Sequence, residues 1–173
     1  MNTKKTLGKK QLFYLWCALA CAIIALDQYT KLLVIEHFPH EGGVITITSF
    51  FNLVRAHNTG AAFSFLSNAG GWQQWLFIGL AGIVAIIILT MLWSHSTQRF
   101  LSLGLSGIMA GAIGNVIDRI NHGYVVDFLD FHLGARHFPA FNVADIGITV
   151  GVAIVILHEL VQMIKEKKNI KNK

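Results

Sequence analysis

The chain alternates between long apolar stretches and shorter segments of mixed polarity. Four apolar stretches lie near residues 12–35, 75–93, 100–118 and 145–164. A helix of roughly 20 apolar residues crosses a hydrocarbon core about 30 Å thick. The pattern therefore predicts four transmembrane helices within a single membrane domain, residues 1–173. The first stretch is too long to be only a removable signal peptide, so we expect it to remain as a helix.

The two longest connecting segments, about 36–74 and 119–144, lie on the same side of the predicted bundle. A loop as long as the first normally carries structure of its own. Within it, Val44–Thr48 alternates apolar and polar residues as a half-buried strand does, and Ala61–Phe65 repeats this pattern more weakly. We therefore expect an all-α membrane protein with a small antiparallel β-sheet at the membrane surface.

Composition and charge support this class and orient the bundle. The chain is 54% hydrophobic and 13% charged, with a mean hydropathy of +0.55, which excludes an ordinary soluble domain. Ten of the 14 basic residues fall on one side: Lys4, Lys5, Lys9, Lys10, Arg99, Lys165, Lys167, Lys168, Lys171 and Lys173. The positive-inside rule makes this side, and both termini, cytoplasmic and the sheet extracytoplasmic. Basic flanks of this kind are typical of contact with anionic membrane lipids, and no nucleic-acid partner is indicated.

Cysteine usage gives no sign of redox or metal chemistry. Cys17 and Cys21 are four residues apart on one face of the first helix, where a disulfide fits poorly, and no second pair completes a metal site. We interpret both as small apolar side chains. We expect neither a metal nor a cofactor.

Two carboxylates are the strongest candidates for chemistry. Asp127 and Asp145 lie at the outer ends of two apolar segments, separated by a short loop. Two neighbouring carboxylates cannot both ionise cheaply, so they share one proton near neutral pH. The ionised partner then takes a proton from water while the protonated one hydrogen-bonds the scissile carbonyl, as in an aspartic protease. Asp130, three residues after Asp127, is a weaker alternative.

Other polar residues lie in or beside the apolar stretches, where each is costly unless paired or facing a wet cavity. They include Asp27, Lys31, Asn115, Asp118 and Arg119. Asp27 and Lys31 are four apart and share a helix face, so that a structural ion pair and a substrate contact both remain open. Asn142 is placed to cap the fourth helix, with Asp145 in its first turn, where a negative charge suits the helix dipole.

Five short blocks of this chain resemble, in order and spacing, the signature blocks of bacterial lipoprotein signal peptidase, also called signal peptidase II. The blocks are Asp27–Lys31, His57–Phe63, Gly114–Arg119, Gly123–Phe128 and Phe141–Asp145. No single block is specific, but five in register from the first span to the fourth are. One departure, His57, lies at the flank of its block, where the family more often has other residues.

The resemblance implies a four-helix, inner-membrane aspartic endopeptidase with its active site near the outer face. Such an enzyme removes the signal peptide from diacylglyceryl-modified prolipoproteins by cutting just before the lipidated cysteine, and we expect it to act as a monomer. The family's catalytic pair matches Asp127 and Asp145, whereas Asp130 matches no catalytic position. Its supporting polar residues match Asp27, Lys31, Asn58, Asn115, Asp118, Arg119 and Asn142. We expect Arg119 and Asn58 to hold the substrate backbone, and the outer sheet to cover the substrate.

Three other functions fit parts of the sequence less well. Gly104–Gly107 has the form of the rhomboid serine-protease motif, with Ser106 as nucleophile and His158 as base, but rhomboids have six core spans, and small residues on a helix more often serve packing. His158–Glu159 lacks the second His of a metalloprotease motif. The third is a small proton-coupled carrier or assembly factor, since buried charges also mark transport paths; a path through the membrane would need polar residues along it, and here the charges crowd at one face.

Overall fold

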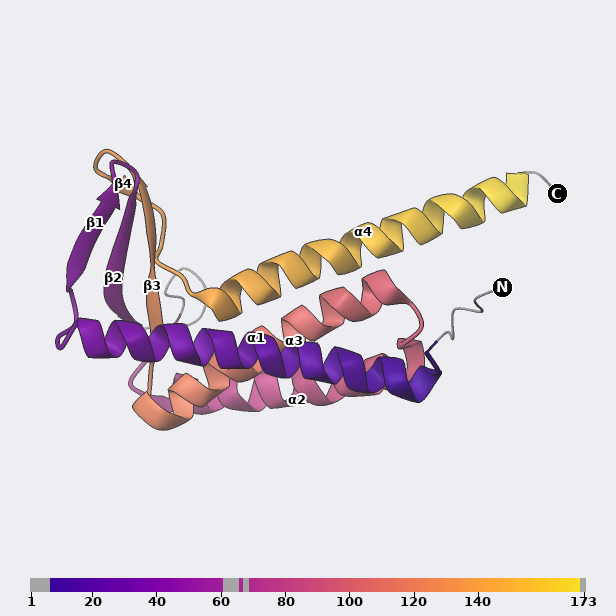
Figure 1. Cartoon of the computed structure of the whole chain (residues 1–173), viewed down its shortest axis with the longest axis horizontal. Coiled ribbons are helices and arrows are strands. Elements are labelled where there is room, and N and C mark those ends of the chain that lie inside the picture. Colours follow the sequence, from indigo (N-terminus) through magenta and orange to yellow (C-terminus); the bar gives the residue numbers. More distant parts are fainter. Residues whose placement is uncertain (1–6, 61–65, 67–68, 172–173) are drawn as a thin grey trace, which may run out of the picture.

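The computed structural model describes residues 7–60, 66 and 69–171. In the described chain the order of elements is α1 (Lys9–His37), β1 (Val44–Thr48), β2 (Phe51–Asn58), α2 (Trp72–His95), α3 (Arg99–His122), β3 (Val125–Leu133), β4 (Arg136–His137) and α4 (Val143–Lys171). The helices run along the long axis, the strands gather at one end, and both chain termini lie at the other (Figure 1). We call these the sheet end and the terminus end.

All four predicted membrane helices are confirmed, each extending a few residues beyond the predicted limits. Each is long and apolar enough to cross a membrane, and large apolar side chains are exposed on α2 and α4, as lipid contact requires. The C-terminal part of α4, beyond its contacts with α3, diverges from the rest of the bundle (Figure 1). The protein is therefore a multi-pass membrane protein.

Helix α3 is the most buried of the four and packs closely against α4 through glycine. A Cβ atom added at Gly107 would lie 2.8 Å from the carbonyl oxygen of Gly147, and one added at Gly104 would lie 2.7 Å from that of Gly151. Lipid tails are as apolar as leucine side chains, so burying apolar side chains between two helices gains little hydrophobic free energy inside a membrane. Helices are joined instead by van der Waals contact, which small residues allow by letting the backbones approach closely. The interpretation of Gly104–Gly107 as a packing motif is confirmed.

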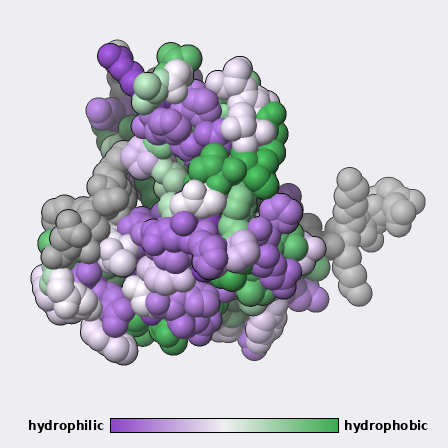
Figure 2. All heavy atoms as spheres, turned by 90° about the vertical axis from the view of Figure 1, so that its left-hand side faces the viewer, coloured by the Kyte–Doolittle hydropathy of each residue, from purple (hydrophilic) through white to green (hydrophobic). Residues whose placement is uncertain are grey.

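The four strands form one antiparallel sheet in the order β1-β2-β3-β4. At the ends of the β2–β3 ladder, Phe51 pairs with Phe131 and Asn58 pairs with Val125. One face of the sheet packs on the end of α1, where Val34, Phe38, Val126 and Phe128 form a small core. Viewed onto the sheet end, hydrophilic side chains cover much of the surface and a hydrophobic patch lies beside them (Figure 2).

The sequence predicted the sheet, but it predicted only one of the four strands. Val44–Thr48 is confirmed as β1, and the strand expected at Ala61–Phe65 lies outside the described residues. Strands β2 and β3 were not foreseen. The first half of β3 is buried on both faces, so its sequence does not alternate in polarity and offers no strand period. The second loop therefore supplies strand β3 beside the first loop's strands.

Candidate active site

Asp145 is held in the first turn of α4 by a reciprocal cap. The Asn142 side-chain oxygen accepts a hydrogen bond from the Asp145 backbone N–H at 3.0 Å, and Asp145 Oδ2 accepts one from the Asn142 backbone N–H at 3.2 Å. This is a capping box, which satisfies two N–H groups that a helix start would leave unpaired. The predicted capping role of Asn142 is confirmed, and the cap fixes the Asp145 carboxylate at the positive end of the helix dipole.

Asp127 lies on β3 and is almost fully buried. Its Oδ1 accepts a hydrogen bond from Asn142 Nδ2 at 2.7 Å, and its Oδ2 accepts one from Asn58 Nδ2 at 3.0 Å. Asn115 Nδ2 donates to Asp145 Oδ1 at 2.9 Å. Asn142 thus bonds both carboxylates, and it links the strand that carries Asp127 to the helix that carries Asp145.

Burial and the neighbouring carboxylate change the acidity of Asp127. Loss of water raises the pKa of Asp127, the charge of Asp145 raises it further, and hydrogen bonds from Asn58 and Asn142 lower it in part. The resulting pKa is about 7. A carboxyl group with this pKa exchanges its proton near neutral pH, as a general acid or base must.

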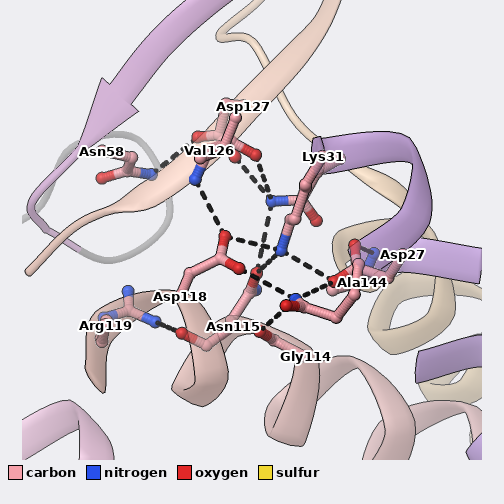
Figure 3. A network of polar contacts seen from close by, with 12 residues as sticks. Asp27, Lys31, Asn58, Gly114, Asn115, Asp118, Arg119, Val126, Asp127 and Ala144 are labelled. Atoms are coloured by element: carbon pink, nitrogen blue, oxygen red, sulfur yellow. Dashed lines mark hydrogen bonds and ion pairs between the residues drawn. The ribbon is translucent and has the colours of Figure 1, made fainter. Parts of the chain in front are cut away.

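A buried ion cluster lies behind the two carboxylates. Lys31 Nζ is 2.8 Å from Asp27 Oδ2 and 2.9 Å from Asp118 Oδ2 (Figure 3). All three residues are at most 2% exposed, and the cleft described below is lined by other residues. Of the two readings left open for Asp27 and Lys31, the structure supports the ion pair.

Arg119 extends from α3 toward the first outer loop. Its Nη2 donates to the Gly60 carbonyl oxygen at 2.7 Å and its Nη1 to the Asn115 carbonyl oxygen at 3.3 Å. The guanidinium also lies over the Phe77 ring, 5.1 Å from its centroid. A planar cation held on an aromatic ring is pre-positioned to bind oxygen acceptors.

These polar groups border a cleft of about 840 Å³ between α2, α3, α4 and the outer strands. Its polar end is formed by Asn58, Asn115, Arg119, Asp127 and Asp145. The rest of its lining is mostly apolar and includes Phe77, Leu80, Ala81 and Val84 of α2, Ile108 and Ala112 of α3, and Ile146, Ile148, Thr149 and Val150 of α4. A mostly apolar pocket with a few convergent polar groups is the usual form of a binding site. Across the described residues, no three His, Cys, Asp or Glu side chains are grouped as metal ligands.

Comparison with known proteins assigns the chain to a family. The family model described as "Signal peptidase (SPase) II" matches residues 19–161. The chain belongs to the signal peptidase II family. It is therefore a membrane protease, and the alternatives of a carrier and a rhomboid-type enzyme are set aside.

Curated relatives in the signal peptidase II family are similar over most of their length. A lipoprotein signal peptidase of Cupriavidus taiwanensis is 49% identical over 146 residues, which cover 84% of this chain and 82% of that protein. One from Ralstonia nicotianae is 52% identical over 145 residues, covering 84% and 83%. A solved structure titled as a bacterial membrane enzyme, determined in meso at 2.3 Å resolution, superposes with a TM-score of 0.77 at 29% identity, covering 86% of this chain and 88% of that one. A second, at 1.9 Å, gives 0.71 at 30% identity, covering 84% and 92%.

The weaker sequence candidates lie away from the cleft. Asp130 accepts hydrogen bonds from Asn52 Nδ2 and the His137 ring, each at 2.9 Å. Burial acts to raise the pKa of Asp130, but these hydrogen bonds, together with the charges of His137 and His132, lower it overall. Ser106 is fully buried, and its hydroxyl donates to the Ser102 carbonyl oxygen at 2.8 Å. Neither side chain lines the cleft.

One residue of the polar cluster was missed. Gln28 Nε2 donates to Asp118 Oδ1 at 2.9 Å and to the Gly114 carbonyl oxygen at 3.2 Å, so it ties α1 to α3 beside the ion cluster. Gln28 lies within the first of the five blocks, between Asp27 and Lys31. A polar amide inside an apolar span was the signal that would have found it.

Proposed function

We propose that Asp127 and Asp145 are the catalytic dyad of an aspartic endopeptidase that removes the signal peptide from diacylglyceryl-modified prolipoproteins by cutting before the lipidated cysteine. The observation that carries the proposal is the position of both carboxylates at the polar end of one apolar cleft. The pKa of about 7 at Asp127 adds to it, because a dyad that shares one proton at neutral pH needs one such group.

The hydrolysis follows from the proton that the pair shares. The ionised carboxylate takes a proton from a water molecule, and the water oxygen bonds to the scissile carbonyl carbon while the other carboxyl group donates its proton to the carbonyl oxygen. The resulting diol then returns a proton to the dyad and the amide nitrogen takes one up as the C–N bond breaks. Asn142 donates hydrogen bonds to both carboxylates, from its side chain to Asp127 and from its backbone N–H to Asp145, so it keeps their spacing through both steps.

The cleft suits a lipidated, extended substrate. Its apolar part, between α2 and α4, would hold the acyl chains and the apolar signal sequence, while Arg119 and Asn58 at the polar end would hold backbone carbonyl groups beside the cut site. Arg119 already binds one main-chain carbonyl, that of Gly60, at 2.7 Å. The sheet would cover the bound segment from above.

The orientation we propose puts the sheet end outside the bacterial inner membrane and both termini in the cytoplasm. Among the described residues, Lys9, Lys10, Arg99, Lys165, Lys167 and Lys168 belong to the parts of α1, α3 and α4 that lie toward the terminus end (Figure 1). Strand β3, which carries Asp127, and the start of α4, which carries Asp145, lie at the sheet end (Figure 1). A lipid anchored in the outer leaflet presents its cysteine near the headgroups, the depth at which Asp127 and Asp145 would then lie. All proposed catalytic groups come from this one chain, so we expect a monomer to suffice.

The test is cleavage of a purified diacylglyceryl-modified precursor by the purified protein in detergent, with the unmodified precursor as control. Asp127→Asn and Asp145→Asn should each lose at least about 10³-fold in rate, because an amide of nearly equal volume replaces the acid or base. Thermal unfolding checks that both variants fold. Near wild-type turnover by either variant would refute the dyad, and an equal rate on the unmodified precursor would refute the substrate.

A further inference from the structure

The backbone N–H of the residue immediately before each dyad aspartate donates to a buried carboxylate on a different element. Asp118 Oδ2, on α3, accepts a hydrogen bond from the Val126 backbone N–H at 3.0 Å, next to Asp127. Asp27 Oδ1, on α1, accepts one from the Ala144 backbone N–H at 2.8 Å, next to Asp145. The two carriers of the dyad, β3 and α4, are thus fixed in the same way.

One ammonium group joins these two attachments. Lys31 Nζ lies 2.8 Å from Asp27 Oδ2, 2.9 Å from Asp118 Oδ2 and 3.1 Å from Asn115 Oδ1 (Figure 3). A lysine ammonium has three N–H groups, and here each has an acceptor. The third branch leads to the dyad as well, because Asn115 Nδ2 donates to Asp145.

From this arrangement we infer that Lys31 is a positioning residue, which sets the separation and the proton sharing of Asp127 and Asp145 from behind the cleft through Asp27, Asp118 and Asn115. The inference rests on the proposed function, since it assumes that the two aspartates form the dyad. It assigns Lys31 no contact with substrate, because Lys31 is only 2% exposed and does not line the cleft.

Stability alone does not explain such a cluster. Replacing a buried ion pair by well-packed apolar side chains is often neutral or stabilising, so an ion pair is a poor device for holding helices together. The backbone also makes room for it: a Cβ at Gly114 would lie 2.6 Å from Asp27 Oδ2. The cluster does supply directed hydrogen bonds to the Val126 and Ala144 backbone amides, which apolar packing would not.

The charge of Lys31 also acts on the dyad. It lowers the pKa of Asp127 in part, against the larger effects of burial and of Asp145 that raise it. Within the described residues, the charged or titratable groups around the dyad are Asp27 and Lys31 on α1, His57 on β2, and Asp118 and Arg119 on α3. Removing the ammonium therefore has two consequences: the spacing loosens, and the dyad retains its shared proton to higher pH.

The experiment compares Lys31→Met and Lys31→Arg, with Lys165→Met as the control because Lys165 is exposed on α4. The readouts are kcat, KM and the pH profile of kcat on the lipidated precursor, each per folded molecule. For Lys31→Met we expect kcat to fall about 10- to 100-fold, KM to change less than about 3-fold, and the pH optimum to move upward. Lys31→Arg should keep the wild-type pH profile with a lower kcat, because a guanidinium keeps the charge but does not place three N–H groups at one point.

A purely structural role predicts a different result. If the role were only structural, the activity of Lys31→Met would fall only as its folded fraction falls, and the pH profile of the remaining activity would not move. Either that result or a wild-type kcat for folded Lys31→Met overturns the inference. If Lys31→Met does not fold, a folded Lys31→Arg variant with wild-type kcat overturns it as well. Asp127→Asn separates the hypothesis of the dyad from that of the positioning role. An active Asp127→Asn enzyme refutes the dyad itself. An inactive Asp127→Asn enzyme, together with a Lys31→Met enzyme of unaltered activity, refutes only the role of Lys31.

Discussion

The two ends of the α3–α4 pair differ in how the helices are joined. Toward the terminus end, Gly104 and Gly107 bring the α3 backbone against Gly151 and Gly147 of α4. At the sheet end, a similar backbone contact between Gly111 and the Ala144 carbonyl oxygen is joined by a side-chain hydrogen bond from Asn115 to Asp145. Close packing costs little in lipid, whereas buried charged groups are expensive and must be paired. The difference indicates that glycine contacts join the two helices along their shared length, and that the buried polar groups added at the sheet end serve chemistry at a cost in stability.

The free-energy cost of burying the Asp127 carboxylate at the sheet end should appear as a dependence of folding stability on pH. The pKa of Asp127 is raised to about 7 in the folded protein from an ordinary value of 3.8, so its protonated form is the one that folding favours. Its contribution to stability is therefore complete below about pH 4 and is lost as the pH rises through 7, by about 4 kcal/mol at most. Asp127→Asn should remove this loss, as measured by thermal unfolding in detergent between pH 5 and pH 8.

Asp130→Asn is the matched control for this prediction. The pKa of Asp130 is lowered in the folded protein. Its contribution to folding stability is therefore present at pH values above the ordinary pKa of an aspartate and is lost only in more acidic solution. Asp130→Asn should therefore leave the slope between pH 5 and pH 8 unchanged. If the stability of Asp127→Asn changed with pH between pH 5 and pH 8 as steeply as that of the wild type, the loss of stability could not be assigned to the dyad.

Loss of Arg119 at the sheet end should reduce activity more than stability. Arg119→Ala removes the bond to the Gly60 carbonyl and the group proposed to hold the substrate backbone, and we expect cleavage to fall about 10²-fold. Arg119→Lys should recover only part of this loss, because the ammonium keeps the charge without the planar fork. Rates at limiting and saturating precursor, compared with thermal stability, check the claim. Activity that merely tracked stability would make Arg119 a structural residue.

Glycine substitutions test the terminus end. At Gly107 a Cβ would lie 2.8 Å from a backbone oxygen of α4, so Gly107→Ala must push the helices apart, at a cost of about 1 to 3 kcal/mol. At Gly79 of α2 nothing lies within 4 Å of the added atom, so Gly79→Ala should be neutral or slightly stabilising. Unfolding of both variants in detergent gives the comparison. Equal stability of the two would mean that α3 and α4 are not held by backbone contact.

The smallest effect is expected at Ser106, the polar residue most easily mistaken for a nucleophile. Its hydroxyl bonds a carbonyl of its own helix, and it lies outside the cleft. Ser106→Ala should keep cleavage within about 2-fold of wild type, since the serine does no chemistry and alanine is a better helix former. Abolished turnover in a stable Ser106→Ala protein would restore the serine mechanism.

The sequence predicted the parts of this molecule that depend on local pattern. Four apolar stretches specified the helices, and the spacing of Asn142 and Asp145 specified the cap, because both rules act within a few turns of chain. The connection from Lys31 to Asp118 was not predictable, since their separation along the chain gives no sign that α1 and α3 meet there. Nor was the role of the Val126 and Ala144 amides, because a backbone group carries no sequence signal. Strand β3 was missed for a related reason, as its burial on both faces removes the alternation.

The most direct test of the central claim is a double-mutant cycle on precursor cleavage. It compares Asp127→Asn, Asp145→Asn and the double variant with wild type at equal amounts of folded protein. If the two carboxylates act as one unit through a shared proton, each single loss should be nearly complete, and the double variant should be no slower than either single variant by more than about 3-fold. Losses that multiply in the double variant would show two independent contributions and contradict the account.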